Sequence, residues 1–441
     1  MNIEEWIYLH KQPHLKKDIE KLSSLQKEHL SKQIHDFDPD VSFSSFLTPK
    51  QITPAPLLSC NPPILENYKL GQKLIMNYQT ACIVLAGGIG TRLGSAEPKG
   101  CFPISNVQNK SLFQLVAEKI LAQGKQLGCR PLVAFMLSSS TQEKTVSFFK
   151  QHQYWGLDPS QVFFFSQKNT PYYDNEGNWF WSREGVIAES PDGNGYLFQN
   201  LDEASIFSQF KQAGVEYVQV IQIDNPLVSP LDPYLIGSHA KLNADILIGA
   251  ISRDQVDEKL GLLTFDQKKI HITEYSEIPE CAFVEKNKKG VFKYPYGNSG
   301  IFSFSMAFIE RLLNHAALQL PPHWVKKKTK SWNHASFEEI WAWKVEHFIF
   351  DLLAYAKKVD AIHLDRKDYY ASLKSKEGPQ GIQAVKEALL EKDIRTFEKI
   401  SRHSAKEHFF ELAPAFYYPT EKLLQYWENR PFPNTSYLSE K

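Results

Sequence analysis

The feature that most constrains this chain is a glycine-rich stretch that directly follows a short apolar segment. Residues 82–86 have the length and composition of a buried strand. A helical pattern covers residues 111–127, with Ser111 as a candidate N-cap. Between them lies Leu85-Ala-Gly-Gly-Ile-Gly-Thr-Arg-Leu-Gly-Ser-Ala-Glu-Pro-Lys-Gly100. A strand, a glycine-rich loop and a helix in this order predict a loop at the carboxyl edge of a parallel sheet, where doubly wound folds bind ligands.

The composition of this loop suits a phosphorylated ligand. Gly87, Gly88 and Gly90 lack side chains, so backbone N–H groups can approach a phosphate or a base closely. Arg92 and Lys99 add two cations that a polyphosphate needs.

Two better-known glycine motifs fail on spacing. A P-loop requires a glycine followed by Lys and then Ser or Thr, and this stretch has no such triplet at the required spacing. A dinucleotide fingerprint that starts at Gly88 would need a glycine at position 93, which is Leu93. A nicotinamide-dependent oxidoreductase is therefore disfavoured.

The rest of the chain continues the alternation of strands and helices. Further strands are predicted at residues 131–137, 162–165, 217–223, 246–251 and 361–364, and helices at 67–78, 141–152, 203–213, 233–242, 337–357 and 381–391. Short strands at 262–265 and 270–274 form a predicted hairpin. The pattern predicts an α/β fold with a doubly wound, mostly parallel sheet.

Three parts of the chain can be separated by sequence. Residues 1–75 read as an N-terminal helical extension, with a helix near residues 22–34 and a proline-rich linker at 48–63. Residues 76–365 form the predicted catalytic domain, and residues 366–441 a small C-terminal lobe. Oligomeric state is not indicated.

Charge and cysteine content exclude several classes of protein. Fifty Lys and Arg residues balance fifty Asp and Glu residues, so no long-range field favours nucleic acid or an anionic membrane as a partner. The N-terminus lacks a secretory signal, and no apolar run reaches the roughly 18 residues of a membrane span. We therefore expect a cytoplasmic protein.

The cysteine content argues against disulfides and thiolate zinc sites, because the cysteines are odd in number and contain no CxxC pair. They are Cys60, Cys82, Cys101, Cys129 and Cys281.

The glycine-rich stretch resembles the signature of the UTP-dependent sugar-1-phosphate uridylyltransferases, and among them the eukaryotic-type UDP-N-acetylglucosamine pyrophosphorylases. Further motifs match in the family order over residues 80–375: Phe163-Phe-Phe-Ser-Gln167, Pro191-Asp-Gly-Asn-Gly195, Ile223-Asp-Asn225, Tyr275-Ser-Glu277, Asn298-Ser-Gly300 and Lys344-x-Glu-x-Phe-x-Phe-Asp351. The resemblance implies a Rossmann-like nucleotidyltransferase core. The implied reaction joins UTP and a hexose-1-phosphate to give UDP-sugar and pyrophosphate, with Mg²⁺ as cofactor.

The resemblance also implies roles for single residues. Asp224 is the implied magnesium ligand, and the cations acting on the phosphates are Arg92, Lys99 and Lys344. The implied substrate-binding residues are Gly87 and Gly88 in the nucleotide loop, Gln167 for the base, Gly193 for the uracil, Asn194 and Glu277 for the sugar, Asn225 and Asn298.

Simpler structural explanations stay open for several of these residues. Asp224 ends an apolar strand, where an Asp often caps a helix or forms a turn. Lys344 lies in the predicted helix 337–357, where it could extend along apolar neighbours and pair with Asp351. The cationic run at residues 326–330 is expected to be a solvated loop.

One departure from the family affects the sugar. The family's Asn-Ala-Gly-Asn segment is Asn298-Ser-Gly-Ile301 in this chain, so its second asparagine is missing. The turn Asp-Gly-Asn-Gly still resembles the N-acetylhexosamine branch. We expect N-acetylglucosamine-1-phosphate as substrate, with glucose-1-phosphate as the alternative and an inactive sugar-nucleotide binding protein as a more distant one.

Overall fold

The computed structural model describes residues 3–35, 37, 53–55, 64–255, 258, 260–266, 269–278, 283–288, 290–433 and 435–440. Most of the predicted proline-rich linker, together with Cys60 and Cys281, lies outside these residues. The chain divides into two compact units. Unit 1 comprises Met1–Lys50, Gln167–Asn200 and Ala317–Leu352, and unit 2 comprises Gln51–Ser166, Leu201–Ala316 and Leu353–Lys441. The division by sequence into residues 1–75, 76–365 and 366–441 stays a prediction.

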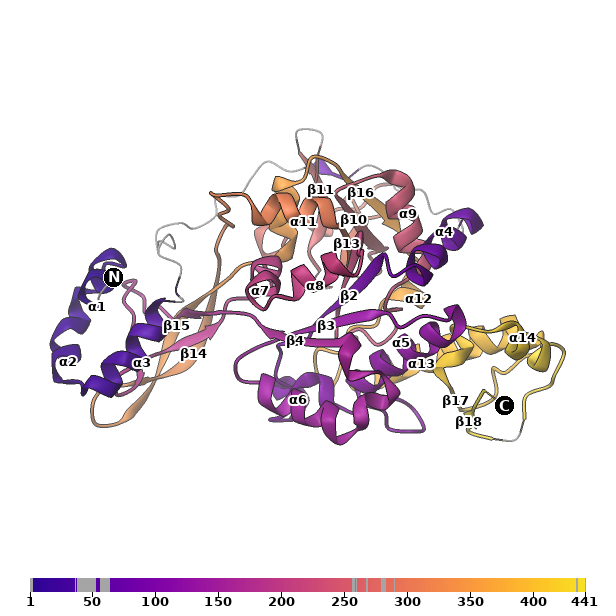
Figure 1. The fold of residues 1–441 in the computed structure, drawn as a ribbon, viewed down its shortest axis with the longest axis horizontal. Coiled ribbons are helices and arrows are strands. Elements are labelled where there is room, and N and C mark those ends of the chain that lie inside the picture. Colours follow the sequence, from indigo (N-terminus) through magenta and orange to yellow (C-terminus); the bar gives the residue numbers. More distant parts are fainter. Residues whose placement is uncertain are drawn as a thin grey trace. The chain divides into compact units, whose positions relative to one another are not determined.

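Unit 2 is built on a ten-stranded mixed sheet (Figure 1). Its main path runs β1-β11-β13-β9-β2-β3-β4, and β10 pairs with β13 and β16 while β12 pairs with β11. The strands are β1 (Thr53–Pro54), β2 (Thr80–Leu85), β3 (Leu132–Leu137), β4 (Val162–Ser166), β9 (Tyr217–Gln222), β10 (Ile246–Ser252), β11 (Leu262–Asp266), β12 (Lys269–Thr273), β13 (Tyr296–Ser305) and β16 (Val359–His363).

Strand directions confirm the α/β prediction and refine it. The neighbours β9, β2, β3 and β4 are all parallel, and β10 is parallel to β16. The strand β13 runs antiparallel to β9, β10 and β11, so the sheet is partly rather than mostly parallel. The predicted hairpin of β11 and β12 is present.

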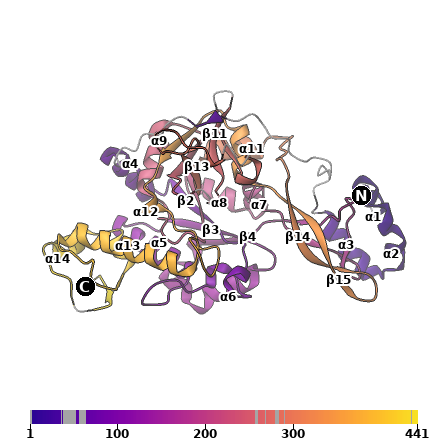
Figure 2. The same ribbon diagram turned by 180° about the vertical axis from the view of Figure 1, so that it is seen from behind.

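The helices of unit 2 follow the predicted order. They are α4 (Leu65–Met76), α5 (Leu112–Leu127), α6 (Gln142–Gln151), α8 (Ile206–Gln212), α9 (Pro233–Leu242), α11 (Met306–Leu313), α12 (Arg366–Tyr369), α13 (Ile382–Ser401) and α14 (Glu421–Trp427), and α7 (Leu197–Glu203) spans the boundary between the units. The predicted helix at 203–213 is divided, because Ser205 adopts a left-handed conformation between α7 and α8. Helix α13 lies beside α5, as the reverse view in Figure 2 also shows. No helix among the described residues has the length and apolar character of a membrane span.

Unit 1 combines short helices with short strands. Its helices are α1 (Ile3–Leu9), α2 (Lys16–Lys21) and α3 (Ser24–His35), the last of which matches the predicted helix near residues 22–34. Its strands are β5 (Asn169–Pro171), β6 (Trp181–Arg183), β7 (Val186–Ile187), β8 (Glu189–Pro191), β14 (His323–Trp332) and β15 (Phe337–Glu346). One apolar cluster joins all three helices to Trp179, Trp181 and Val345.

Two predictions fail in the hairpin of β14 and β15. The predicted helix 337–357 is wrong, because residues 337–346 form β15 and a 3₁₀ turn follows at Ile349–Tyr355. The cationic run is not a loop but part of β14, where the Lys326 and Lys328 side chains lie over the rings of Trp343 and Trp341 on β15. Pairing with a partner strand outweighs the helical spacing of the aromatic residues.

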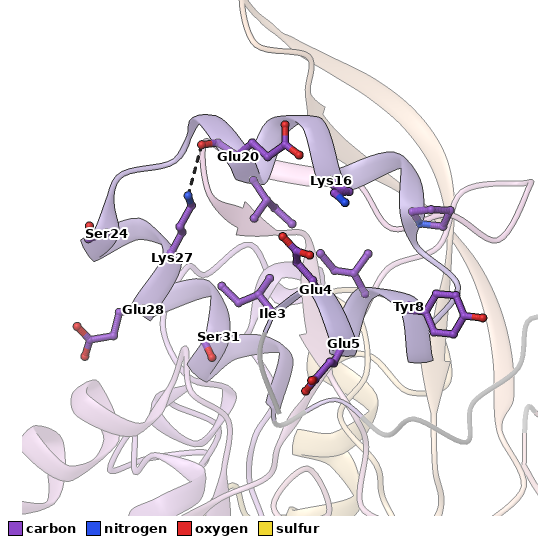
Figure 3. A pocket seen from close by; sticks show the side chains of 13 residues that line it. Ile3, Glu4, Glu5, Tyr8, Lys16, Glu20, Ser24, Lys27, Glu28 and Ser31 are labelled. Atoms are coloured by element: carbon purple, nitrogen blue, oxygen red, sulfur yellow. Dashed lines mark hydrogen bonds between the residues drawn. The ribbon is translucent and has the colours of Figure 1, made fainter.

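An open pocket of about 1060 Å³ lies among the N-terminal helices (Figure 3). Ile7 and Ile19 are among the apolar residues that line it, and Glu4, Glu20 and Lys27 are among the charged ones. None of the predicted site residues lines this pocket. We therefore give it no part in the chemistry.

Candidate active site

The glycine-rich loop of unit 2 folds back on itself in a narrow turn. Gly90 N donates to Glu97 O at 3.0 Å, and Lys99 N donates to Gly88 O at 2.9 Å. The Ser138 hydroxyl, just beyond β3, donates to Gly87 O at 2.8 Å. These bonds hold the loop in a defined shape at the carboxyl end of β2.

The same loop leaves backbone donors without partners. The N–H groups of Gly87 and Gly88 donate to no acceptor in the described part of the chain. A Cβ atom at Gly88 would meet nothing within 4 Å, so the space in front of this residue is open. The Arg92 side chain is exposed and makes no hydrogen bond or ion pair with any described residue. The arrangement suits an anion, because it offers free N–H donors and a free cation.

Asp224 and Lys99 form the charged centre of the site in unit 2. Strands β2 and β9 are parallel neighbours, with Leu85 opposite Gln222, so their carboxyl ends bring the loop and Asp224 to the same edge. Lys99 Nζ lies 3.2 Å from Asp224 Oδ2, and both side chains are almost buried, with 13% and 12% of their surface exposed.

The Asp224 carboxylate is only half satisfied. Its Oδ1 atom is buried and has no hydrogen-bond partner among the described residues. A buried carboxylate oxygen without a partner is costly, and Mg²⁺ commonly takes one or two carboxylates together with substrate phosphates. No group of three or more acidic, His or Cys side chains in the described ranges could form a separate metal cage. The residues present therefore fit a magnesium ion held by Asp224 and by the substrate.

The structure places Asn225 in a different setting from the one expected. Asn225 Nδ2 donates to Tyr369 O at 2.8 Å, and Asn225 Oδ1 accepts from Ala371 N at 3.1 Å. The side chain is buried, and both ends of its amide are used by the backbone. Leu373 N donates to Asp224 O at 2.8 Å in the same region. This geometry favours a structural role for Asn225, which ties residues 369–373 to the Asp224 loop, over direct substrate contact.

Asn298 lies at an irregularity of β13, where the register against β10 shifts between Gly249 and Ala250. Asn298 Oδ1 accepts from Gly300 N at 2.9 Å, which holds the amide close to its own backbone. Ile301 is 1% exposed and belongs to the main apolar cluster of unit 2. The side chain at position 301 is thus directed into the core. Glu277 ends a 3₁₀ turn after β12 and is partly exposed.

In unit 1, the turn that carries Gly193 and Asn194 is folded around a residue that the sequence did not single out, His347. The N–H groups of Asn194 and Gly195 both donate to His347 O, at 3.0 and 2.9 Å, and His347 N donates to Asp192 O at 2.7 Å. The Asn194 side chain accepts from Ile349 N at 2.8 Å through Oδ1. Its Nδ2 makes no hydrogen bond with a described residue and can donate to a ligand.

The His347 ring completes this arrangement. Its Nδ1 lies 2.5 Å from Asp192 Oδ1 and, since a carboxylate can only accept, carries the proton. The ring is 1% exposed and packs edge-on against Tyr196, and its Nε2 has no partner within the described chain. Nothing in the sequence around His347 indicates its contact with Asp192, because the two residues are far apart along the chain. Asp192 itself belongs to the Asp-Gly-Asn-Gly motif, which was the only sequence feature that could have pointed to this contact.

Lys344 and Gln167 also belong to unit 1. Lys344 lies on β15 opposite Val325, and its ammonium pairs with Glu346, two residues along the same face of the strand. The alternative explanation, a pairing of Lys344 with Asp351, is wrong, because Asp351 instead lies 2.9 Å from His323 Nε2. Gln167 directly follows β4, is partly exposed and forms no side-chain hydrogen bond with a described residue.

Comparison with known proteins identifies the family of this chain. A family profile described as UTP–glucose-1-phosphate uridylyltransferase, UDPGP, matches residues 48–407. The UDP-N-acetylglucosamine pyrophosphorylase of Saccharomyces cerevisiae is 30% identical over 388 residues, which cover 83% of this chain and 81% of the yeast protein. The UDP-N-acetylglucosamine diphosphorylase 2 of Arabidopsis thaliana is 30% identical over 325 residues, which cover 70% of this chain and 64% of that protein.

A solved structure has the same fold. The uridine diphosphate N-acetylglucosamine pyrophosphorylase of Trypanosoma brucei, solved with an inhibitor, superposes with a TM-score of 0.79 at 23% identity. The match covers 96% of this chain and 93% of that one. Together with the sequence matches, this shows that the chain belongs to the UDPGP family of UDP-sugar pyrophosphorylases, which are nucleotidyltransferases.

Proposed function

We propose that this protein transfers the uridylyl group of UTP to a hexose-1-phosphate, giving UDP-sugar and pyrophosphate, and that N-acetylglucosamine-1-phosphate is its preferred substrate. The observation that supports the reaction best is the Lys99–Asp224 pair beside a loop with free N–H donors. Cations and backbone donors at this edge match the triphosphate that the reaction consumes.

The reaction needs no covalent intermediate with the protein. An oxygen of the sugar phosphate attacks the α-phosphorus of UTP in line, the bond from that phosphorus to the bridging oxygen breaks, and pyrophosphate leaves with the electron pair. A phosphate monoester is already anionic, so no general base is needed to generate the nucleophile. The protein acts by positioning and by neutralising charge.

Each charged residue has a proposed part. Arg92 and Lys99 would neutralise the β- and γ-phosphates, and the N–H groups of Gly87 and Gly88 would bind phosphate oxygens. Asp224 would hold Mg²⁺, which neutralises charge on the phosphates when it is bound. Lys344, held in place by Glu346, would act on the phosphate of the incoming sugar.

The proposed roles of the remaining residues concern the base and the sugar. Gln167 has a free amide for an edge of the uracil, and the backbone at Gly193 would lie against the ring. Asn194 would donate from Nδ2 to the sugar. Glu277 would accept from sugar hydroxyl groups, and Asn298 would contact the sugar from β13.

The buried position of Ile301 bears on the identity of the sugar. Because this side chain lies in the core, we infer that the missing family asparagine has little effect on the choice of sugar. The acetamido preference therefore rests on the Asp-Gly-Asn-Gly turn. Glucose-1-phosphate stays the second candidate, because the matching family profile carries that name.

The reaction is tested by pyrophosphate release from UTP with a panel of sugar-1-phosphates. We expect kcat/KM to be higher for N-acetylglucosamine-1-phosphate than for glucose-1-phosphate at fixed UTP and magnesium. A higher kcat/KM for glucose-1-phosphate would show that glucose-1-phosphate is the preferred substrate instead. Binding of UDP-sugar without any pyrophosphate release would favour the inactive binding protein.

The metal assignment is tested by Asp224→Asn, which keeps the shape of the side chain and removes its charge. We expect kcat to fall by about 10²-fold or more, because the carboxylate would no longer hold the cation. The exposed Asp202 serves as the matched control, and Asp202→Asn should keep the parent rate. Near-parental turnover of Asp224→Asn with the same magnesium dependence would contradict the assignment.

A further inference from the structure

The loop that follows Asp224 is held by two lysines from two different helices. Lys119 of α5 donates through Nζ to Pro226 O at 2.5 Å and to Val228 O at 3.0 Å. Lys392 of α13 donates through Nζ to Leu227 O at 2.6 Å. Three consecutive carbonyl groups, at 226, 227 and 228, thus each accept a hydrogen bond from a lysine Nζ atom.

Lys392 also binds the second segment that contacts the Asp224 loop. Its Nζ donates to Asp368 O at 2.8 Å. The residues that follow Asp368 are those tied to Asp224 and Asn225 by the bonds at Tyr369, Ala371 and Leu373. One ammonium group of α13 therefore joins the loop after Asp224 to the segment that packs against it.

Burying the two lysine side chains costs desolvation free energy, which their hydrogen bonds to the loop must offset. Lys119 is 5% exposed, and burial, aided by the nearby charge of Lys392, lowers the pKa of Lys119 well below its ordinary value. Burial also lowers the pKa of Lys392 to about 8. Within the described chain neither lysine has a carboxylate at ion-pair distance, although both lie over the Tyr417 ring. Apolar side chains would fill this space without the desolvation cost, so what the lysines add is directed bonding to the loop.

We propose that Lys392, together with Lys119, is a positioning residue for uridylyl transfer, which fixes the carbonyl groups of residues 226–228 and so the orientation of the Asp224 carboxylate. Helix α13 thereby takes part in forming the active site. The inference rests on the proposed role of Asp224. Neither lysine is expected to touch the substrate.

The test compares Lys392→Met with a matched variant on the same helix, Lys399→Met. Lys399 is exposed and makes no hydrogen bond or ion pair with a described residue. We expect Lys392→Met to lower kcat by about tenfold with little change in the KM for UTP, because misplacing a reacting group affects the transition state more than binding. Lys392→Arg keeps a charged donor and should recover part of the rate. Lys399→Met should behave as the parent protein.

A second measurement does not depend on activity. Hydrogen exchange followed by mass spectrometry, on the free protein without substrate or metal, should show faster exchange in the peptide covering residues 224–230 of Lys392→Met. Exchange in strands β3 and β4 should stay unchanged. Lys399→Met should leave both regions as in the parent protein.

The possible outcomes separate the two proposals. Parental kcat in Lys392→Met, or faster exchange throughout the protein instead of in the loop, would overturn the positioning role. If the parent protein released no pyrophosphate with any sugar phosphate, the proposed function would fail. Faster exchange confined to residues 224–230 would then still support the contact of α13 with the loop.

Discussion

At the scale of single residues, the backbone of the Asp-Gly-Asn-Gly turn decides which side chain position 193 can accept. Gly193 has a φ of +98°, and a Cβ atom there would lie 2.5 Å from His347 O. The positive φ and the close approach of His347 O both exclude a side chain at position 193. The bonds from Asn194 and Gly195 to the same carbonyl would be disturbed by any shift that relieved the contact.

We therefore expect Gly193→Ala to weaken the binding of UDP-sugar by more than about tenfold, a free-energy loss of roughly 1.4 kcal/mol. The matched control is Gly214→Ala, since Gly214 also has a positive φ, +82°, but a Cβ atom there meets nothing within 4 Å. It should cost some stability without affecting binding. Calorimetric titration of both variants with UDP-sugar measures this difference. Equal affinities of Gly193→Ala and Gly214→Ala for UDP-sugar would exclude a role of the turn in binding.

A second residue, His239, makes stability depend on pH. Its ring is buried, with Nε2 bonded to Ala244 O at 3.0 Å and Nδ1 to the Ser303 hydroxyl at 2.7 Å. The carbonyl must accept, so Nε2 carries the proton and neutral Nδ1 accepts from Ser303. Burial lowers the pKa of His239 to about 4. In the unfolded chain the histidine binds a proton at higher pH than in the folded one, so its contribution to stability is lost as the pH falls from about 6.5 to 4.

At pH 5 this linkage corresponds to about 2 kcal/mol of the free energy of unfolding. The loss of stability between pH 7 and pH 5 should therefore be smaller by that amount in His239→Gln than in the parent protein. Denaturant titrations at the two pH values measure it. The exposed His29 provides the comparison, and His29→Gln should keep the parental loss. The same pH dependence in His239→Gln and the parent would mean that other groups cause the acid sensitivity.

At the scale of elements, α5 is the helix whose ends the sequence predicts best. Ser111 Oγ accepts from Gln114 N at 3.1 Å, and Gly128 ends the helix in the left-handed conformation. We expect Ser111→Ala to lower the free energy of unfolding by about 1 kcal/mol, because one N–H group of the first turn loses its acceptor. Denaturant titration measures the change, and Ser111→Asp should preserve most of the stability. Equal stability of the Ala variant would show that the cap bond contributes nothing.

Elements such as α5 are predictable because their signals are local. Apolar spacing and a capping residue lie within a few positions of one another, and the same holds for the strand–loop–helix unit that carries Lys99. The hairpin of β14 and β15 shows the limit. Phe337, Ile340 and Trp341 have helical spacing, but cross-strand partners on β14 determine the structure. Such pairing is not visible within the segment itself.

The same limit applies to the site. The motifs single out Asp224, Lys99 and Asn194 as candidates, because their residue types and their places after strands or in turns are local features. The sequence did not indicate the contacts of His347 and Asn225, because their partners lie 155 and 144 residues away along the chain. Contacts over such separations depend on the tertiary structure.

At the scale of the whole molecule, the C-terminal residues complete unit 2. Glu411 accepts from Val107 N and Gln108 N through one carboxylate oxygen, at 2.8 and 2.9 Å, and its other oxygen lies 3.6 Å from Lys110 Nζ. Lys110 is 4% exposed and is also bonded to Glu118 and Tyr437. The segment that leads into α5 is thus held by a carboxylate some 300 residues later in the chain.

This contact predicts how far the C-terminal residues stabilise unit 2. Replacing Glu411 by Leu removes the acceptor of two backbone N–H groups and one charge beside Lys110, and should lower the free energy of unfolding by about 2–4 kcal/mol. Glu421→Leu, at an exposed position of α14, is the control and should change stability little. Denaturant unfolding followed by fluorescence and by circular dichroism should show one coincident transition for Glu411→Leu, shifted to lower denaturant. One transition in the parent protein and two in Glu411→Leu would mean instead that residues 366–441 unfold independently once this contact is lost, as the three-part division by sequence suggests, and that Glu411 holds two domains together rather than one unit.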